Sequence, residues 1–227
     1  MVRTSSVLKR PWQTCDALLR STPESLQSLT PGRLVAVFVV FGCLYGATMG
    51  SFGGDAGPRG LQMLYSALKV PLLVGVTFAL SVPSFFVMMT LFGLRDDVGA
   101  SLRALMATQA ALSIVLASFA PFTLLWYVSS SGYSAALLFN AAMFGLASLT
   151  VQRVLKRLYQ PLIERDRRHL MMMRVWLGIF AFVGIQMGWV LRPFIGNPAE
   201  PTLFFRAEAW GNAYEMIAKH IANGLGL

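Results

Sequence analysis

The chain has 227 residues, of which 56% are hydrophobic and only 13% are charged, and its mean hydropathy is +0.60. Soluble domains contain about 45–50% apolar and about 25% charged residues, so this composition excludes an ordinary soluble domain. The formal net charge of +9 at pH 7 comes from 19 Lys and Arg against 10 Asp and Glu. In so apolar a chain we attribute the excess of Lys and Arg to the flanks of membrane spans, and we expect no nucleic acid partner.

Five apolar stretches come close to the length of about 20 residues that a bilayer-spanning helix needs, and none of them contains a charged residue. The sequence therefore predicts an all-α polytopic membrane protein with five transmembrane helices. The stretches are 34–51, 70–94, 104–128, 134–151 and 175–191.

Basic residues are divided unevenly between the two sides of this layout. Fourteen lie in the N-terminal segment and in the loops after the second and fourth spans, against five elsewhere. Cytoplasmic loops carry most Lys and Arg, so we expect a bacterial inner-membrane protein with its N-terminus in the cytoplasm and its C-terminus outside. The expected parts are a cytoplasmic segment (1–33), a five-helix transmembrane domain (34–191) and an external tail (192–227).

Glycines recur at four-residue intervals in the first and last spans. They are Gly42, Gly46 and Gly50 in the first span, and Gly184 and Gly188 in the last. This spacing puts them on one helix face, where another backbone can approach closely. The pattern predicts a helix-packing seam, either within this chain, which we favour, or against another subunit.

Prolines lie in two of the expected spans. Pro83 is in the middle of the second span, where its ring removes one backbone hydrogen bond, and Pro121 is near the outer end of the third. We expect a kink at each, and we prefer a packing kink to a gating hinge or a broken-helix binding site. Lys69 and Pro71 are expected at the outer end of the second span, where a lysine reaches the headgroups and a proline fits the first helical turn.

The segment between the fourth and fifth spans is the most charged part of the chain. The rule that cytoplasmic loops are basic already accounts for it, and we add contact with anionic lipid headgroups as a functional expectation. Asp96 and Asp97, before the third span, are expected to cap its helix rather than to bind a metal ion. The cations expected to contact anionic lipid are Arg153, Lys156, Arg157, Arg165, Arg167, Arg168 and Arg174.

Two further helices are expected outside the spans. The run 22-TPE-24 is typical of a helix start, with a cap, a first-turn proline and an acidic residue, and it predicts a short cytoplasmic surface helix. Apolar residues on one face over about 203–222 predict an amphipathic helix that lies on the outer membrane surface or packs across the spans.

Catalytic and cofactor chemistry has little support in the sequence. The chain has only two histidines, His169 and His220, which we expect on opposite sides of the membrane, and it contains no metal-binding or nucleophile–base motif. We therefore expect no enzyme, no metal site and no cofactor, while a pigment or haem ligand at either histidine stays open. The expected spans contain no Asp, Glu, Lys or Arg, which argues against a pump or an ion-coupled carrier. Cys15 and Cys43 are not expected to form a disulfide.

The run 65-YSALKVPLL…LSVPSFF-86, together with the five-span layout, resembles bacterial membrane proteins grouped with the Yip1-like family, over roughly residues 40–195. Eukaryotic members of that family are membrane scaffolds that bind small GTPases, so the resemblance implies a scaffold and assigns no role to a residue.

We therefore expect a non-catalytic membrane scaffold or an accessory subunit of a larger assembly, in contact with lipids and with other membrane protein subunits. The alternative is a small transporter or channel for a neutral or lipidic solute. Dry, glycine-packed spans would favour the scaffold, whereas a water-accessible polar cavity lined by Asn140 or Gln186 would favour transport.

Overall fold

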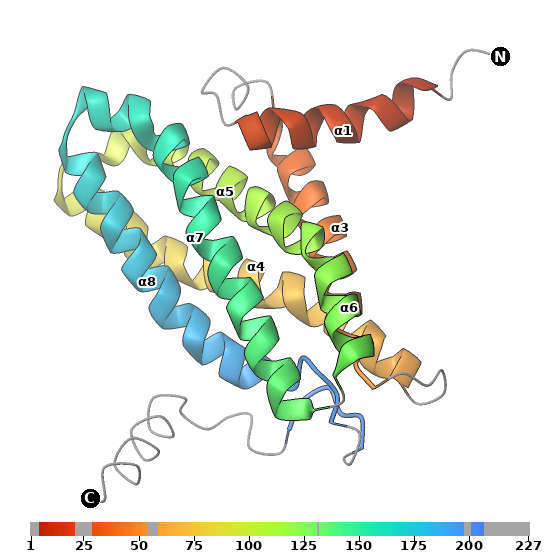
Figure 1. Cartoon of the computed structure of the whole chain (residues 1–227). Coiled ribbons are helices and arrows are strands. Elements are labelled where there is room, and N and C mark those ends of the chain that lie inside the picture. Colours follow the sequence, from red (N-terminus) through yellow and green to blue (C-terminus); the bar gives the residue numbers. More distant parts are fainter. Residues whose placement is uncertain (1–4, 21–28, 54–58, 131, 198–200, 207–227) are drawn as a thin grey trace, which may run out of the picture.

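The computed structural model describes residues 5–20, 29–53, 59–130, 132–197 and 201–206, and within these ranges the regular elements are all helices (Figure 1). They are α1 (Ser5–Arg20), α3 (Pro31–Gly50), α4 (Arg59–Leu91), the 3-10 turn η1 (Arg95–Asp97), α5 (Val98–Ser118), α6 (Ala120–Ser129), α7 (Tyr133–Arg165) and α8 (Arg168–Leu191).

Five helical segments of the described chain are long and apolar enough to cross a bilayer: α3, α4, α5 continued by α6, α7, and α8. They contain between 20 and 35 residues, whereas a span needs about 20. The predicted all-α, five-span fold is therefore confirmed, and by helix length and hydropathy the protein is a multi-pass membrane protein. The helices extend beyond the predicted spans, most of all α4, which begins at Arg59 instead of residue 70, and α7, which ends at Arg165 instead of residue 151.

The five segments pack as a bundle in which α3 contacts α4 and α5, α8 lies against α4, and α7 lies against α5 (Figure 1). One apolar cluster surrounds Trp176, whose ring meets Phe78 and Phe85 edge-on with 5.2 Å between ring centroids in each pair. A second cluster surrounds Tyr45 and Leu116 further along the bundle. These two clusters fix how the helices sit against one another.

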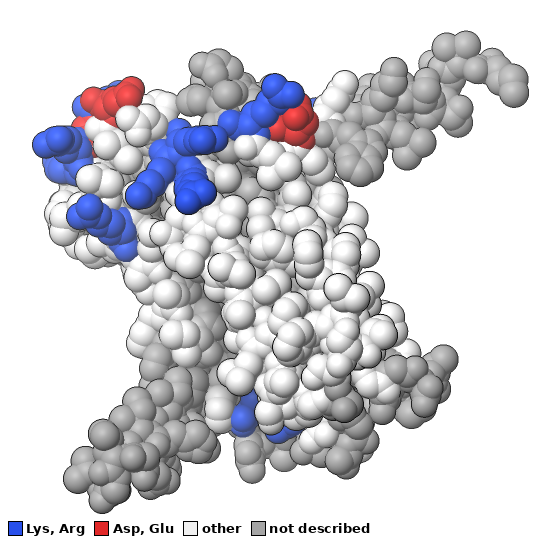
Figure 2. Space-filling view, in the orientation of Figure 1, with Lys and Arg blue, Asp and Glu red and all other residues white. Residues whose placement is uncertain are grey.

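Charged side chains gather at one end of the bundle, and its middle is apolar (Figure 2). We call this the basic end; it carries α1, the turn between α4 and α5, and the turn between α7 and α8. At the opposite end α3 and α6 terminate, α4 and α7 begin, and residues 192–206 follow α8. This distribution has the asymmetry that the sequence predicted, with an apolar belt between two unequal polar ends.

Helix α1 lies across the basic end, at the start of α3 (Figure 1). It buries Cys15 and Leu18 in the cluster around Trp176. The sequence analysis missed it and expected a helix from 22-TPE-24, which lies outside the described residues. Apolar residues at Trp12, Cys15 and Leu19 follow helical spacing and could have predicted α1.

At the other terminus, residues 203–206 are not helical. The rest of the helix expected over 203–222 lies outside the described residues, as does His220.

The prolines act in different ways. α4 continues as a helix through both Pro71 and Pro83. Pro71 is therefore not in a first helical turn, because α4 begins three turns earlier than expected. Pro121 stands in the first turn of α6, and the chain leaves one helix at Ser118 and starts the next at Ala120.

Candidate functional site

The glycine face of α3 packs against α4 within this chain. If a Cβ were added at Gly42, Gly46 or Gly50, it would lie 3.1 Å from Pro71 Cγ, 2.9 Å from Ala67 Cα and 2.6 Å from Met63 Cα respectively. The last two neighbours are backbone atoms, which cannot move aside without shifting the helix. These three glycines therefore set the distance between α3 and α4.

Glycines elsewhere in the bundle are less crowded. At Gly184 an added Cβ would stand 3.5 Å from Thr77 Cγ2, which is an ordinary contact. At Gly188 and at Gly145 no atom lies within 4 Å of that position. Close packing at glycines is therefore found between α3 and α4 and not at Gly184 and Gly188 of α8.

The segment that follows α8 is fastened to α4 by polar side chains. Gln62, Ser66 and Lys69 are spaced four and three residues apart, so they share one face of α4. Lys69 Nζ donates to the Pro193 carbonyl at 2.7 Å, and Ser66 Oγ donates to the Phe194 carbonyl. Gln62 Nε2 donates to the same Phe194 carbonyl at 3.3 Å and to Ser66 Oγ at 3.0 Å.

A third carbonyl in this segment is also bonded, since Tyr133 Oη donates to the Ile195 carbonyl at 3.4 Å. Three consecutive carbonyls of irregular backbone thus receive side-chain donors from α4 and α7. The sequence analysis treated this region as a connector. The spacing of Gln62, Ser66 and Lys69 was the signal that could have revealed it.

Lys69 is fully buried, with 0% of its surface exposed. The expectation that it reaches the headgroups is therefore wrong: its ammonium group bonds Pro193 and lies 4.9 Å from the centre of the Phe204 ring. The stretch predicted as the second span, 70–94, stops just short of Lys69, whereas the helix that is long and apolar enough to span runs from Gly60 to Leu91 and includes it. A buried charge in a span is costly, so it marks a candidate functional region.

A cavity of about 450 Å³ opens beside this segment. Leu73, one helical turn beyond Lys69, forms part of its wall, and two arginines contribute its charged groups. The lining residues are Met49, Leu73, Tyr133, Leu137, Asn140, Ala141, Phe144, Arg192, Pro193, Phe194, Ile195, Asn197 and Arg206. We call it the arginine cavity.

Asn140 lines the arginine cavity but uses its amide within the protein. Its Nδ2 donates to Tyr127 Oη at 2.7 Å and to the Ala136 carbonyl at 2.8 Å, and its Oδ1 accepts from Tyr45 Oη at 3.3 Å. Gln186 is half-buried on α8 and lines neither this cavity nor the next. Of the two residues considered for a polar solute path, Asn140 therefore lines a cavity and Gln186 does not.

A second cavity, of about 460 Å³, lies between α4, α5, α7 and α8, and we call it the central cavity. Its walls are mostly apolar, but Thr77 and Gln109 also line it, with 1% and 8% of their surfaces exposed. In the part of the chain that the structure describes, Thr77 Oγ1 and Gln109 Oε1 have no hydrogen-bond partner. Leu73 and Phe144 line both cavities, so the two are adjacent.

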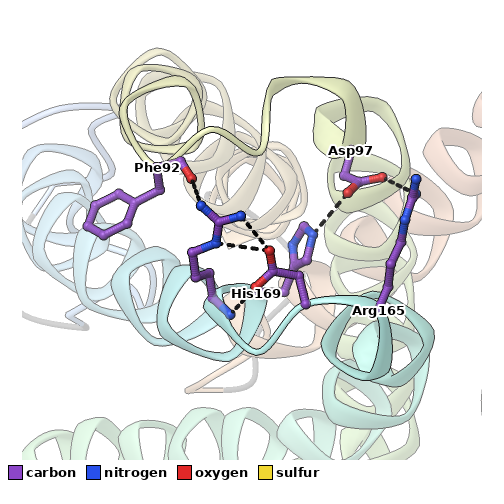
Figure 3. A network of polar contacts seen from close by, with 6 residues as sticks. Phe92, Asp97, Arg165 and His169 are labelled. Atoms are coloured by element: carbon purple, nitrogen blue, oxygen red, sulfur yellow. Dashed lines mark hydrogen bonds and ion pairs between the residues drawn. The ribbon is translucent and has the colours of Figure 1, made fainter.

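A polar network closes the basic end (Figure 3). Asp97 Oδ1 accepts from Arg165 Nη1 at 2.7 Å, and Asp97 Oδ2 lies 3.2 Å from His169 Nε2. The capping role expected for Asp97 is wrong, because its side chain makes no cap hydrogen bond. His169 is 0% exposed and meets Tyr159 edge-on, with 6.1 Å between ring centroids. His169 is thus part of a junction between α8 and η1.

The same junction includes the turn from α7 to α8 (Figure 3). Arg168 Nη1 donates to the Phe92 carbonyl at 2.8 Å, and its Nη2 donates to Asp166 Oδ2 at 2.7 Å. Hydrogen bonds from Arg168 lower the pKa of the Asp166 carboxyl. The network ties the two turns of the basic end together.

The seven cations expected to contact lipid are all exposed. Arg165 and Arg168 form the ion pairs just described. The other five make no ion pair with a described residue: Arg153, Lys156, Arg157, Arg167 and Arg174.

Among the described residues, no group of three or more His, Cys, Asp or Glu side chains is placed to hold a metal ion, and Cys15 and Cys43 are both free thiols. No protein-family model matches the chain, and searches of curated proteins and of solved structures return no similar protein. The likeness to the Yip1-like family therefore remains one of layout: five long apolar helices in a multi-pass membrane protein.

Proposed function

We propose that the protein is a non-catalytic inner-membrane protein that binds a lipidic molecule within its helix bundle, as a small transporter for a lipidic solute. The central cavity carries this proposal. Its volume of about 460 Å³ falls in the range of about 300–1,000 Å³ typical of ligand sites. Its wall is apolar apart from a few polar groups, which is the usual composition of such sites.

The two polar atoms of the central cavity strengthen this proposal. A buried polar atom without a hydrogen bond lowers the stability of a protein by about 1–3 kcal/mol, so Thr77 Oγ1 and Gln109 Oε1 destabilise the protein when the cavity is empty. A ligand with a hydroxyl or amide group would satisfy them. Because Asn140 is already bonded within the protein, the geometry favours a lipidic ligand over a polar one.

A second candidate is the scaffold or accessory subunit of a membrane assembly. Unequal burial favours it: 39% of the most apolar stretch of α3 is buried inside the protein, against 17% of that of α8. The dry glycine contact between α3 and α4 also fits a rigid scaffold. In this role the outer side of α8 would contact another membrane protein subunit.

Both candidates share one proposed placement in the membrane. The basic end faces the cytoplasm, because Lys and Arg accumulate on that side of inner-membrane proteins. There the five cations that make no ion pair with a described residue, which include Arg153 and Arg174, contact anionic headgroups. The opposite end, with the arginine cavity, then faces outward.

The test is to fill the central cavity. Ala181 and Ala142 are both exposed, but only Ala181, on α8, lines the central cavity, so Ala181→Trp should fill it and Ala142→Trp on α7 should not. Wild-type protein and an Ala142→Trp control, purified in mild detergent, should carry a specific lipidic molecule in native mass spectra, and Ala181→Trp should lose it. If the wild type carries no such molecule, or all three proteins carry it equally, the ligand proposal fails. If membrane proteins co-purify with the wild type, and substitution of exposed residues on α8 abolishes this co-purification, the scaffold would be supported instead.

A further inference from the structure

We propose that the arginine cavity binds the anionic head of a single-chain amphiphile whose hydrocarbon chain extends into the central cavity. The inference rests on the proposed lipidic ligand and names its chemical class: one acyl chain that ends in a carboxylate or a phosphate. It assigns the head to Arg192 and Arg206 at the end of the bundle opposite the basic end.

Charge complementarity supports an anionic head. Arg192 and Arg206 both line the arginine cavity, and none of the described residues that line it is acidic. A guanidinium group is planar and presents its donors in a fork that matches a carboxylate or a phosphate. In a site with low-dielectric walls, two such cations attract an anion far more strongly than they would in water.

The segment that carries Arg192 is held in place. The Arg192 guanidinium stacks over the Trp189 ring, with 3.3 Å between its central carbon and the ring centroid. Lys69 donates to the carbonyl of the next residue, Pro193, at 2.7 Å. Lys69 is therefore a positioning residue, which fixes the backbone next to Arg192 and adds a third positive charge behind the cavity wall.

The route of the chain follows from the shared walls of the cavities. Leu73 and Phe144 line both, so a chain whose head lies at Arg192 passes these two side chains on its way into the bundle. Apolar side chains such as Leu137 in the first cavity and Leu112 in the second suit methylene groups. A hydroxyl group carried by the chain would satisfy Thr77 Oγ1 and Gln109 Oε1 in the second cavity. An amphiphile thus places its charge at the membrane surface and its chain in the interior.

The experiment measures binding of palmitate to the full-length protein in an uncharged detergent. Cetyl alcohol, which has the same chain without the charge, and inorganic phosphate, which is an anion without a chain, serve as competing probes. Palmitate should bind saturably, cetyl alcohol should compete weakly and phosphate should not compete. Arg192→Gln and Arg206→Gln should each weaken palmitate binding about tenfold to a hundredfold, because each removes a charge-assisted hydrogen bond to the head.

The control variant is Arg95→Gln, which removes an exposed cation at the basic end that has no proposed lipid contact, and it should leave palmitate binding unchanged. Helical content by circular dichroism shows whether each variant is folded. If cetyl alcohol and palmitate bind equally and neither arginine matters, the anionic head is wrong while the lipidic ligand stands. If neither chain binds, both proposals fail. Competition by inorganic phosphate alone would identify a free anion as the ligand and would overturn the amphiphile.

Discussion

Asp96 and Asp97 show, at the scale of the residue, that position in the fold and not residue type decides the role of a side chain. Asp96 is exposed on η1, whereas Asp97 is half-buried and contacts Arg165 and His169 from two other helices. The partners of Asp97 are 68 and 72 residues away in the sequence. No local pattern could reveal such contacts, and the sequence analysis therefore assigned both aspartates to capping.

Asp97→Asn should destabilise the junction at the basic end. The change removes the negative charge that pairs with Arg165 and faces the buried His169, which should cost about 1–3 kcal/mol. Asp96→Asn is the matched control, and as an exposed surface change it should stay within about 0.5 kcal/mol of the wild type. Thermal unfolding in detergent measures both. Equal unfolding temperatures for the two variants would remove the structural role given to Asp97.

At the scale of the helix, spacing predicts a packing face but not its partner. Glycines four residues apart place Gly42, Gly46 and Gly50 on one side of α3, and the sequence left open whether this side meets the same chain or another subunit. The contact with Ala67 and Met63 is a property of the folded bundle. It became visible only once α3 and α4 were seen side by side.

Gly46→Leu should destabilise the protein itself. Its side chain would enter the space occupied by the Ser66 carbonyl and Ala67 Cα, both backbone atoms of α4, and overpacking of this kind costs about 1–3 kcal/mol or more. Gly145→Leu is the control, because no atom lies within 4 Å of that position. In membranes Gly46→Leu should be scarce and heat-labile, and Gly145→Leu should match the wild type. A stable, abundant Gly46→Leu protein would mean that α3 and α4 are not in close contact.

Helix boundaries were the least predictable part of the fold, for a physical reason. An apolar run contains only residues that suit lipid, so the predicted second span began at residue 70. Gln62, Ser66 and Lys69 were therefore left outside it. In the structure these polar residues are helical and bond the carbonyls of Pro193 and Phe194. The number of spans follows from hydropathy, but the candidate site depends on contacts between residues more than 120 positions apart.

Over the whole molecule, the two ends of the bundle differ in the state of their cations. At the basic end Arg153, Lys156 and Arg174 are exposed, which suits contact with a charged membrane surface. At the opposite end Lys69 is buried, and Arg192 and Arg206 line a cavity. The same residue types are therefore suited to different purposes: the exposed ones to contact with a membrane surface, and the enclosed ones to recognition of a ligand.

The proposed orientation predicts which end of the bundle reacts with an impermeant thiol reagent in intact cells. In a chain with Cys15 and Cys43 replaced by serine, Ser129→Cys reports on the outer end and Asp96→Cys on the basic end, since both positions are exposed. Excess Lys and Arg hold the basic end in the cytoplasm, so Ser129→Cys should be labelled in intact cells and Asp96→Cys only after lysis. The reverse pattern would invert the orientation and place the arginine cavity in the cytoplasmic half of the membrane. Labelling of both positions before lysis would show that α5 and α6 together do not cross the bilayer as one span.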